Sequence, residues 1–250
     1  TLSVFVLPLD EGKVWVDAVQ IETGLVATPF RPSPYDAGFT LPQPVVHPPA
    51  DVNLSDVPTL VLGGKVAEPP LIDGWMTESF WADSPEIRLN DYMGATADVT
   101  TQVRMAYDDQ AVYFHLTLAD PAFARGIKDT VELFIDVLGV GDPYYQFIFD
   151  ALGTKQNFRS LHGLHEWDWQ AEWQVATRMG DGEWTAEVAI PYSSMPDTAT
   201  LAGLGELRVQ IARNYGPGPE KYVSWSPVNV GFLEPDRFGR VILGRDTPIV

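Results

Sequence analysis

The feature that most constrains the fold is a series of short segments in which apolar residues stand at every second position. In residues 131–136 the odd-numbered side chains are Val, Leu and Ile, and the even-numbered ones are Glu, Phe and Asp. Segments 144–149, 184–190 and 207–214 continue the pattern. Successive side chains of a strand point to opposite faces, so each segment predicts a half-buried strand. Gly, Asp and Pro residues separate them, and many short strands at this spacing predict an all-β, antiparallel β-sandwich of the jelly-roll or immunoglobulin-like kind.

Local signals add detail to this sandwich. Residues 102–107 and 112–118 flank Asp108-Asp109-Gln110, which predicts a β-hairpin. Helical signals are weak, and we expect only short helical pieces, near Glu78 and Ser193. Strand aromatics tend to pack inward, so Trp81, Trp184 and Trp225 are expected to be structural.

The charge composition limits the classes of binding partner that the chain can have. The 250 residues carry 16 Lys and Arg against 34 Asp and Glu, a net charge of -18. Such a surface repels nucleic acid and anionic membranes, because phosphate binding needs clustered cations. Neutral glycans remain compatible with it. No stretch approaches the ~20 apolar residues of a membrane span, and the absence of cysteine excludes disulfides and thiolate metal sites.

The sequence predicts three regions. Residues 1–30 contain two β-rich runs, and the string Val14–Gly24 resembles the closing strands of a galactose-binding-like jelly roll. Two strands cannot form a core by themselves. They must pair with preceding sequence, with the main domain, or with another copy of the chain as a homodimer. Because the chain opens at Thr1 without Met, we expect a fragment or a processed product.

Residues 31–59 read as a linker, because ten of the 21 prolines fall between Pro29 and Pro70. Proline fixes φ and removes a backbone donor, so this linker is expected to be extended and semi-rigid. Residues 60–250 form the main domain in this interpretation.

Four segments of the main domain, taken in their order along the chain, carry a resemblance to a known family. They are Leu71-Ile72-Asp73-Gly74-Trp75 continuing to Trp81, the strand-like run 129–136, the run Glu183–Pro191, and the segment Phe232–Arg240. Together they resemble the family 9 carbohydrate-binding modules and their wider DOMON-like relatives, over roughly Leu60 to Gly244. The resemblance implies a β-sandwich that binds sugar without catalysing a reaction.

The resemblance also implies individual roles. A Glu that bonds sugar hydroxyls matches Glu132, and one of two stacking tryptophans falls at Phe232, which retains an aromatic platform. The other falls at Gly126, where the platform is missing, and a basic residue of the family is replaced near Ile148. Phe123 or Trp167 is positioned in the chain to substitute for the missing ring.

The residues themselves suggest further ligand contacts. Sugars stack on aromatic rings, and the dense loop-like segment His162–Trp169 offers Trp167 and Trp169. An alternative is that one of these indoles plugs the end of the sandwich. Glu132 is expected to lie beside Gln146 and Ile148 of the next strand, with Arg104, Arg213 and Asn214 approaching from other strands. The alternative is that Glu132 is a solvent-exposed strand carboxylate with no role in ligand binding.

Metal and catalytic signals are weaker. Structural calcium, which the family often carries, is expected at turn acids such as Asp120 and Asp129, and no organic cofactor is expected. His162 and His165 have a spacing that suits a loop metal clamp without an identifiable third ligand. Glu166 with Asp168, and Glu183 with Glu187, are carboxylate pairs of a type that glycosidases use, but such pairs are common on strands.

The sequence therefore predicts a non-catalytic carbohydrate-binding module of a secreted or bacterial cell-surface protein with several domains, acting on a neutral polysaccharide. The proposed contacts are Phe232, Trp167 or Trp169, Glu132, Gln146 and Arg213. Two alternatives stay open. One is an assembly or spacer sandwich that has no sugar affinity, and the other is a metal-binding, haem-binding or catalytic domain built on the His162–Trp169 segment.

Overall fold

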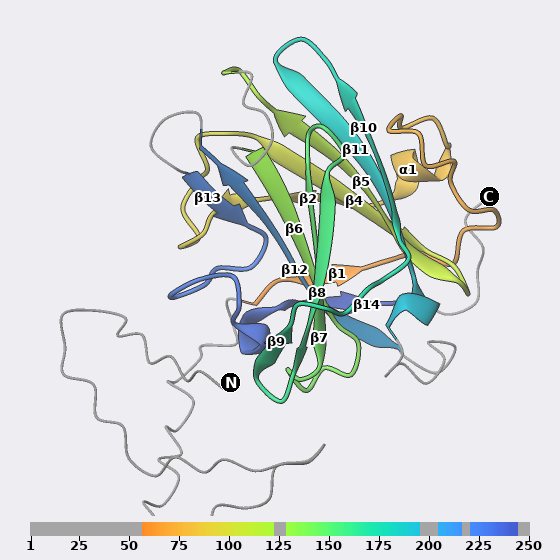
Figure 1. The fold of residues 1–250 in the computed structure, drawn as a ribbon. Helices are drawn as coiled ribbons and strands as arrows, with labels where there is room; N and C mark the ends of the chain where they lie inside the picture. The colour runs from red at the N-terminus through yellow and green to blue at the C-terminus, as the bar shows by residue number, and fades with distance from the viewer. Residues whose placement is uncertain (1–56, 123–128, 196–204, 217–220, 245–250) are drawn as a thin grey trace, which may run out of the picture. The chain divides into compact units, whose positions relative to one another are not determined.

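The computed structural model describes residues 57–122, 129–195, 205–216 and 221–244. The jelly-roll strands predicted in 1–30, and the linker up to residue 56, lie outside the described residues. Within the described part the chain is almost entirely β, and its strands form two sheets, as predicted (Figure 1). No helix in this part is long and apolar enough to cross a membrane.

The larger sheet has its central strands in the order β1-β14-β12-β6-β7-β8-β9, with β13 paired to β12 and β3 paired to β13. All its pairs are antiparallel except the parallel pair of β1 and β14. Its strands are β1 (Thr59–Val61), β3 (Asn90–Asp91), β6 (Asp129–Asp136), β7 (Tyr144–Asp150), β8 (Lys155–Leu161), β9 (Leu164–Glu166), β12 (Glu206–Tyr215), β13 (Lys221–Ser224) and β14 (Gly239–Ile242).

The smaller sheet is antiparallel, with the order β10-β11-β5-β4-β2. Its strands are β2 (Glu86–Arg88), β4 (Thr101–Tyr107), β5 (Ala111–Ala119), β10 (Gln174–Met179) and β11 (Glu183–Pro191). The predicted hairpin around Asp108 is confirmed as β4 and β5. The short helical pieces are also confirmed, as α1 (Phe80–Asp83) and the 3-10 turn η3 (Tyr192–Ser194), and a second 3-10 turn, η5 (Pro235–Arg237), precedes β14.

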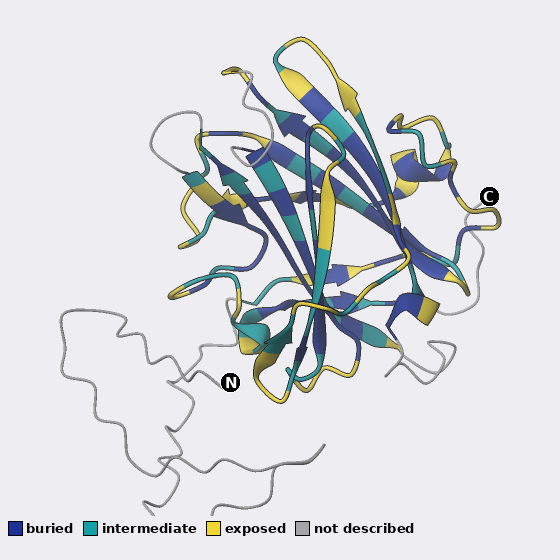
Figure 2. Ribbon diagram, viewed as in Figure 1, coloured by how far each residue is buried: buried dark blue, intermediate teal, exposed yellow. Residues whose placement is uncertain are grey.

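The core lies between the two sheets. Val131, Leu133 and Ile135 of β6 are fully buried against side chains such as Phe114 and Val188 of the smaller sheet. Burying such a side chain contributes about 1.5–3 kcal/mol relative to exposure. Buried and half-buried residues alternate over Asp129–Glu132, as Figure 2 shows, and from Leu133 onward β6 is buried on both faces. Because successive side chains of a strand point to opposite faces, Glu132 and Phe134 lie on the outer face of the larger sheet.

Two of the sequence landmarks interlock on the outer face of the smaller sheet. The carboxylate of Glu187 in β11 is fully buried and accepts the backbone N–H groups of Asp73 and Gly74, each at 3.0 Å. The indole N–H of Trp81 also donates to it, at 3.2 Å. Burial raises the pKa of Glu187 above its ordinary value, and these donors oppose that rise. The segment 71–81 is therefore tied to the sheet, and Glu187 has a structural role.

The tryptophans predicted to be structural are buried. Trp81 and Trp184 have no exposed surface, and Trp225 is 8% exposed. Trp225 packs so close to Gly239 that a Cβ added there would lie 2.5 Å from the indole. Only glycine fits this close approach.

Candidate functional site

Glu132 lies at the centre of the outer face of the larger sheet. Its neighbours in register are Ala212 on β12 and Ile148 on β7. One carboxylate oxygen accepts a hydrogen bond from Asn214 Nδ2 at 2.6 Å, and the other accepts one from Gln146 Nε2 at 2.7 Å. The expectation that Glu132 lies beside Gln146 and Ile148 is confirmed. Asn214 joins them, whereas Arg104 lies in the smaller sheet and bonds Glu86 and the Trp81 and Ser84 carbonyls.

The environment of Glu132 suits it to accept hydrogen bonds from uncharged groups such as amides and hydroxyls. Burial raises the pKa of its carboxyl above the ordinary value, while the hydrogen bonds from Asn214 and Gln146 lower it in part. No Lys or Arg among the described residues forms an ion pair with Glu132. A carboxylate offers about four lone-pair positions, and the two amides occupy two of them. The remaining capacity suits hydroxyl groups.

One group of aromatic side chains lies on the β13 side of Glu132. Tyr222 stands opposite Asn214 in the sheet register and is 38% exposed. Its ring meets Phe232 edge-on, with centroids 6.3 Å apart, and Tyr92 at 6.1 Å. Phe232 is half-buried and packs against the cluster of Phe134, Tyr144, Ala212 and Phe238 on this face. The predicted platform residue is thus brought to the same face as Glu132.

The loop that carries Phe232 is held by one carboxylate. Glu234 accepts the backbone N–H groups of Asn229, Val230 and Gly231 at 2.9, 2.6 and 3.1 Å. Its neighbour Pro235 begins the 3-10 turn η5, which fixes φ at the start of that turn. The landmark Phe232–Arg240 therefore encodes a rigid support for the ring.

A second aromatic group lies on the β8–β9 side. The segment predicted as a loop, His162–Trp169, in fact contains the short strand β9, which pairs with β8 across a turn at His162 and Gly163. The loop prediction was wrong at Leu164–Glu166, because a strand this short leaves no usable periodicity, and it holds for the rest of the segment. Trp167 follows β9, is 68% exposed, and meets Phe158 of β8 edge-on with ring centroids 4.7 Å apart.

The two tryptophans of this segment point to different environments. Trp169 is half-buried and packs against the core rings of Tyr145 and Phe147, with centroids 5.2 and 6.0 Å away. Both of those rings belong to the inner face of the sheet. Trp169 thus closes the side of the sandwich, and the structure brings only Trp167 to the outer surface.

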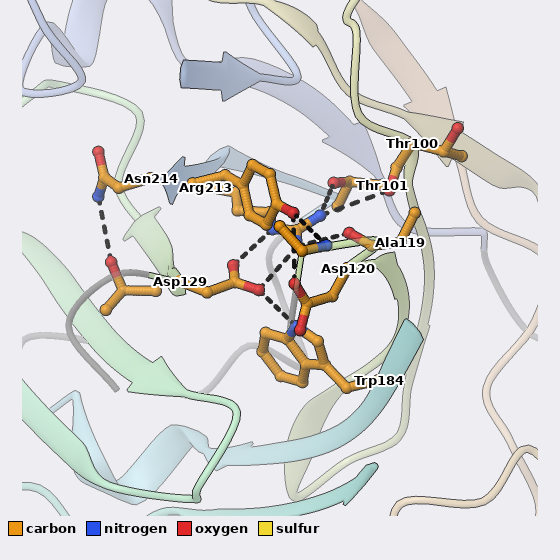
Figure 3. Close-up of polar contacts among 11 residues, drawn as sticks. Thr100, Thr101, Ala119, Asp120, Asp129, Trp184, Arg213 and Asn214 are labelled. Carbon is orange, nitrogen blue, oxygen red and sulfur yellow. Dashed lines mark hydrogen bonds and ion pairs between the residues drawn. The ribbon is translucent and has the colours of Figure 1, made fainter. Parts of the chain in front are cut away.

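The structure does not bring Arg213 to this face. Its guanidinium is fully buried on the inner side and forms an ion pair with Asp129, with N–O distances of 2.7 and 2.8 Å (Figure 3). The remaining donors bond Thr101 Oγ1 and the carbonyls of Thr100 and Ala119. All five N–H donors of the guanidinium are used within the protein, so the prediction that Arg213 contacts the ligand was wrong.

The two acids expected to bind calcium are engaged in the same buried cluster. Asp129 accepts the indole N–H of Trp184 at 2.7 Å as well as Arg213, and Asp120 accepts the hydroxyl of Tyr215 at 3.3 Å (Figure 3). In the described ranges, no group of three or more His, Asp or Glu residues is arranged to hold a metal ion. Calcium binding stays a prediction.

The two histidines singled out in the sequence are also placed, as is Glu166 of the first carboxylate pair. His162 sits exposed at the hairpin turn with φ 55°, and the His165 ring lies 3.5 Å from the Tyr144 hydroxyl, so the two do not converge on one point. Glu166 forms an ion pair with Arg159. Gly126 and Phe123 lie outside the described residues.

Sequence reasoning missed Tyr222 and Phe158 as members of this face. Tyr222 lies in a four-residue strand, and Phe158 lies in a strand whose other residues, apart from Leu161 at its end, are polar. Neither segment shows the alternation that marks a half-buried strand. The usable signal is register: each residue stands opposite a polar residue that bonds Glu132.

The chain is thus a two-sheet β-sandwich, and the outer face of its larger sheet carries aromatic side chains on either side of a hydrogen-bonded carboxylate. The chain matches the family model described as "Carbohydrate family 9 binding domain-like" over residues 72–245. It therefore belongs to this family. No match is found among curated proteins.

Solved structures show the same fold. A family 9 carbohydrate-binding module from Caldicellulosiruptor kristjanssonii in complex with cellotriose superposes with a TM-score of 0.59 at 15% identity, covering 77% of this chain and 99% of that one. A structure of a family 9 module from the same organism, in complex with glucose, gives 0.55 at 16% identity, covering 76% and 98%. At such identities the likeness is one of fold.

Proposed function

We propose that this chain is a non-catalytic module that binds a neutral glycan on the outer face of the larger sheet. The observation that carries the proposal is the Glu132 carboxylate, held by Gln146 and Asn214 between aromatic groups on either side. Sugar rings would stack on Phe232 and Trp167, while hydroxyl groups donate to Glu132. Membership of the family and the cellotriose and glucose bound by the two solved relatives support a carbohydrate ligand.

The charge of the site supports a neutral ligand. The chain has a net charge of -18, and the central side chain of the site is a carboxylate without an ion-pair partner in the described part of the chain. An acidic glycan would have to bring its own negative charges next to this carboxylate, which is unfavourable at short range. A neutral glycan supplies only hydroxyl donors and acceptors.

We extend the proposal to the parent protein. A module of this kind would raise the local concentration of an attached polysaccharide-degrading enzyme on its substrate, in a secreted or cell-surface protein. The family membership supports this role. Because Trp167 and Tyr222 are exposed at the surface, a bound glycan would keep much of its own surface in water, and we expect weak binding by a single module.

A second candidate function is an assembly or spacer module without sugar affinity. It is favoured by the fact that both Glu132 oxygens already accept amide hydrogen bonds, as a purely structural carboxylate would. The partly buried packing of Phe232 on Phe134 and Phe238 points the same way.

A binding assay on a panel of neutral polysaccharides separates the two functions. The sugar-binding function predicts retention on at least one polysaccharide and loss of that retention in Glu132→Ala. An assembly module predicts no retention on any polysaccharide, together with self-association or capture of a defined partner domain.

A further inference from the structure

The two aromatic groups stand on opposite sides of Glu132, and the strand order fixes how far apart they are. Tyr222 of β13 is opposite Asn214 of β12, and Phe158 of β8 is opposite Gln146 of β7. Each of these amides donates to Glu132 of β6. Counting from β13 through β12, β6 and β7 to β8 gives four strand spacings, or about 19 Å across the strands at ~4.8 Å each. The two residues are also offset along the strands, because Asn214 pairs with Thr130 and Gln146 with Phe134.

This separation excludes one mode of binding. Two rings that clasp a single sugar from both faces must approach each other to within about two van der Waals contacts, which is far less than four strand spacings. Phe232 adjoins Tyr222 and Trp167 adjoins Phe158, so the two platforms lie on opposite sides of Glu132. They are placed to stack different rings of one ligand.

We propose that the site takes an internal stretch of a neutral glycan chain, laid across the strands from the Phe232 platform to a second platform formed by Trp167. The inference rests on the proposed sugar-binding function and specifies its ligand. Recognition would not require a chain end, because Phe232 and Trp167 would stack two different rings of the ligand rather than clasp one ring from both faces. The polar centre at Glu132 would contact hydroxyl groups between the two stacked rings.

The β8–β9 hairpin has the rigidity that a platform needs. His162 and Gly163 at its turn have φ of 55° and 72°, which gives a tight two-residue turn. Arg159 and Glu166 form an ion pair across it, with Nε 2.6 Å from the carboxylate oxygen. The edge of Phe158 supports the Trp167 indole, which is otherwise 68% exposed. A large ring held in place before binding loses little entropy on contact.

Isothermal titration of the full chain with cello-oligosaccharides of two to six units tests the inference. Each oligosaccharide is used both with its free reducing end and after borohydride reduction of that end. The variants are Trp167→Ala and a matched control, Leu164→Ala, which removes an exposed apolar side chain from the same hairpin. Leu164 is adjacent to His165 in β9 and so faces away from the Tyr144 side. Circular dichroism confirms that both variants are folded.

The inference predicts that affinity rises with chain length, by about tenfold once the ligand spans both platforms. Reduction of the chain end should leave the affinity of the longest ligand unchanged. Trp167→Ala should abolish the gain with length and keep the weaker binding of short ligands, and Leu164→Ala should behave as wild type. Affinity that is independent of length, that is lost on reduction of the end, or that is unaffected by Trp167→Ala would overturn the inference while leaving sugar binding intact. If the wild type gives no heat of binding with any oligosaccharide and is not retained on any polysaccharide of the panel, the proposed function itself is overturned.

Discussion

Acid should destabilise this sandwich through one buried histidine. His115 of β5 is 3% exposed, and its Nε2 atom has no hydrogen-bond partner. Burial is the main reason that its pKa is lowered from 6.5 to about 4, the nearby Arg104 lowers it further, and Glu78 raises it. Its cross-strand neighbours are Arg104 and Glu187, and the Trp81 ring lies 5.9 Å away.

The sign and size of the effect follow from these values. The unfolded chain binds a proton at His115 near pH 6.5, whereas the folded chain does so only near pH 4. Stability from the neutral imidazole is therefore complete above pH 6.5 and is lost as the pH falls toward 4. The difference of about 2.5 between the pKa of His115 in the unfolded and folded chain corresponds to about 3 kcal/mol in the free energy of unfolding. The raised pKa of Glu187 acts in the opposite direction, because a carboxyl that protonates more readily when folded stabilises the fold in acid.

A comparison of variants isolates the histidine. Urea unfolding at pH 7 and pH 4.5 should show that wild type loses about 2–3 kcal/mol more than His115→Leu between these pH values. At pH 7 the variant should unfold at a similar or higher urea concentration, because an unpartnered buried polar atom is removed. His162→Asn, at an exposed position with φ 55°, is the matched control and should follow wild type. Equal pH dependence in His115→Leu and wild type would refute the reasoning.

Three further predictions concern the core. Arg213→Met leaves Asp129 buried and unpaired, and should cost about 3–5 kcal/mol in the free energy of unfolding measured in urea; a cost under about 1 kcal/mol would contradict the buried ion pair. Trp169→Ala should lower the thermal midpoint, because a core-packing ring is lost, yet leave the affinity for any bound oligosaccharide unchanged in titration; loss of affinity in the folded variant would place Trp169 in the site. Gly239→Ala should destabilise by about 1–3 kcal/mol because its Cβ would overlap the Trp225 ring, and unchanged thermal unfolding would show that the indole can move.

The period of two in the sequence was enough to predict the sandwich and the side of β6 that faces outward. It was also enough to place Glu132 beside Gln146, because antiparallel neighbours share a face. The same rule, applied to β12, would have placed Arg213 correctly. Arg213 shares its parity with buried Leu207 and Ile211, whereas Asn214 has the other parity. The prediction placed Arg213 and Asn214 together beside Glu132, although adjacent residues of one strand point to opposite faces.

Other features were beyond the sequence because no local rule determines them. Trp167 and Trp169 follow the last residue of β9, so alternation no longer decides their direction, and packing against Tyr145 and Phe147 turns Trp169 inward. The partner of Glu187 is likewise set by a contact between residues more than a hundred positions apart in the chain. Such pairings depend on the register of distant strands.

The measurement that tests sugar binding most directly is isothermal titration of the full chain with cellotriose, comparing wild type, Phe232→Ala and Val230→Ala. Val230 is 93% exposed in the same loop and serves as the matched control. Saturable heat in wild type and Val230→Ala, with at least about a tenfold loss of affinity in Phe232→Ala, is the predicted result. Saturable binding that Phe232→Ala leaves unchanged would contradict a site on this face, and the absence of heat with cellotriose and with every longer oligosaccharide would contradict sugar binding altogether.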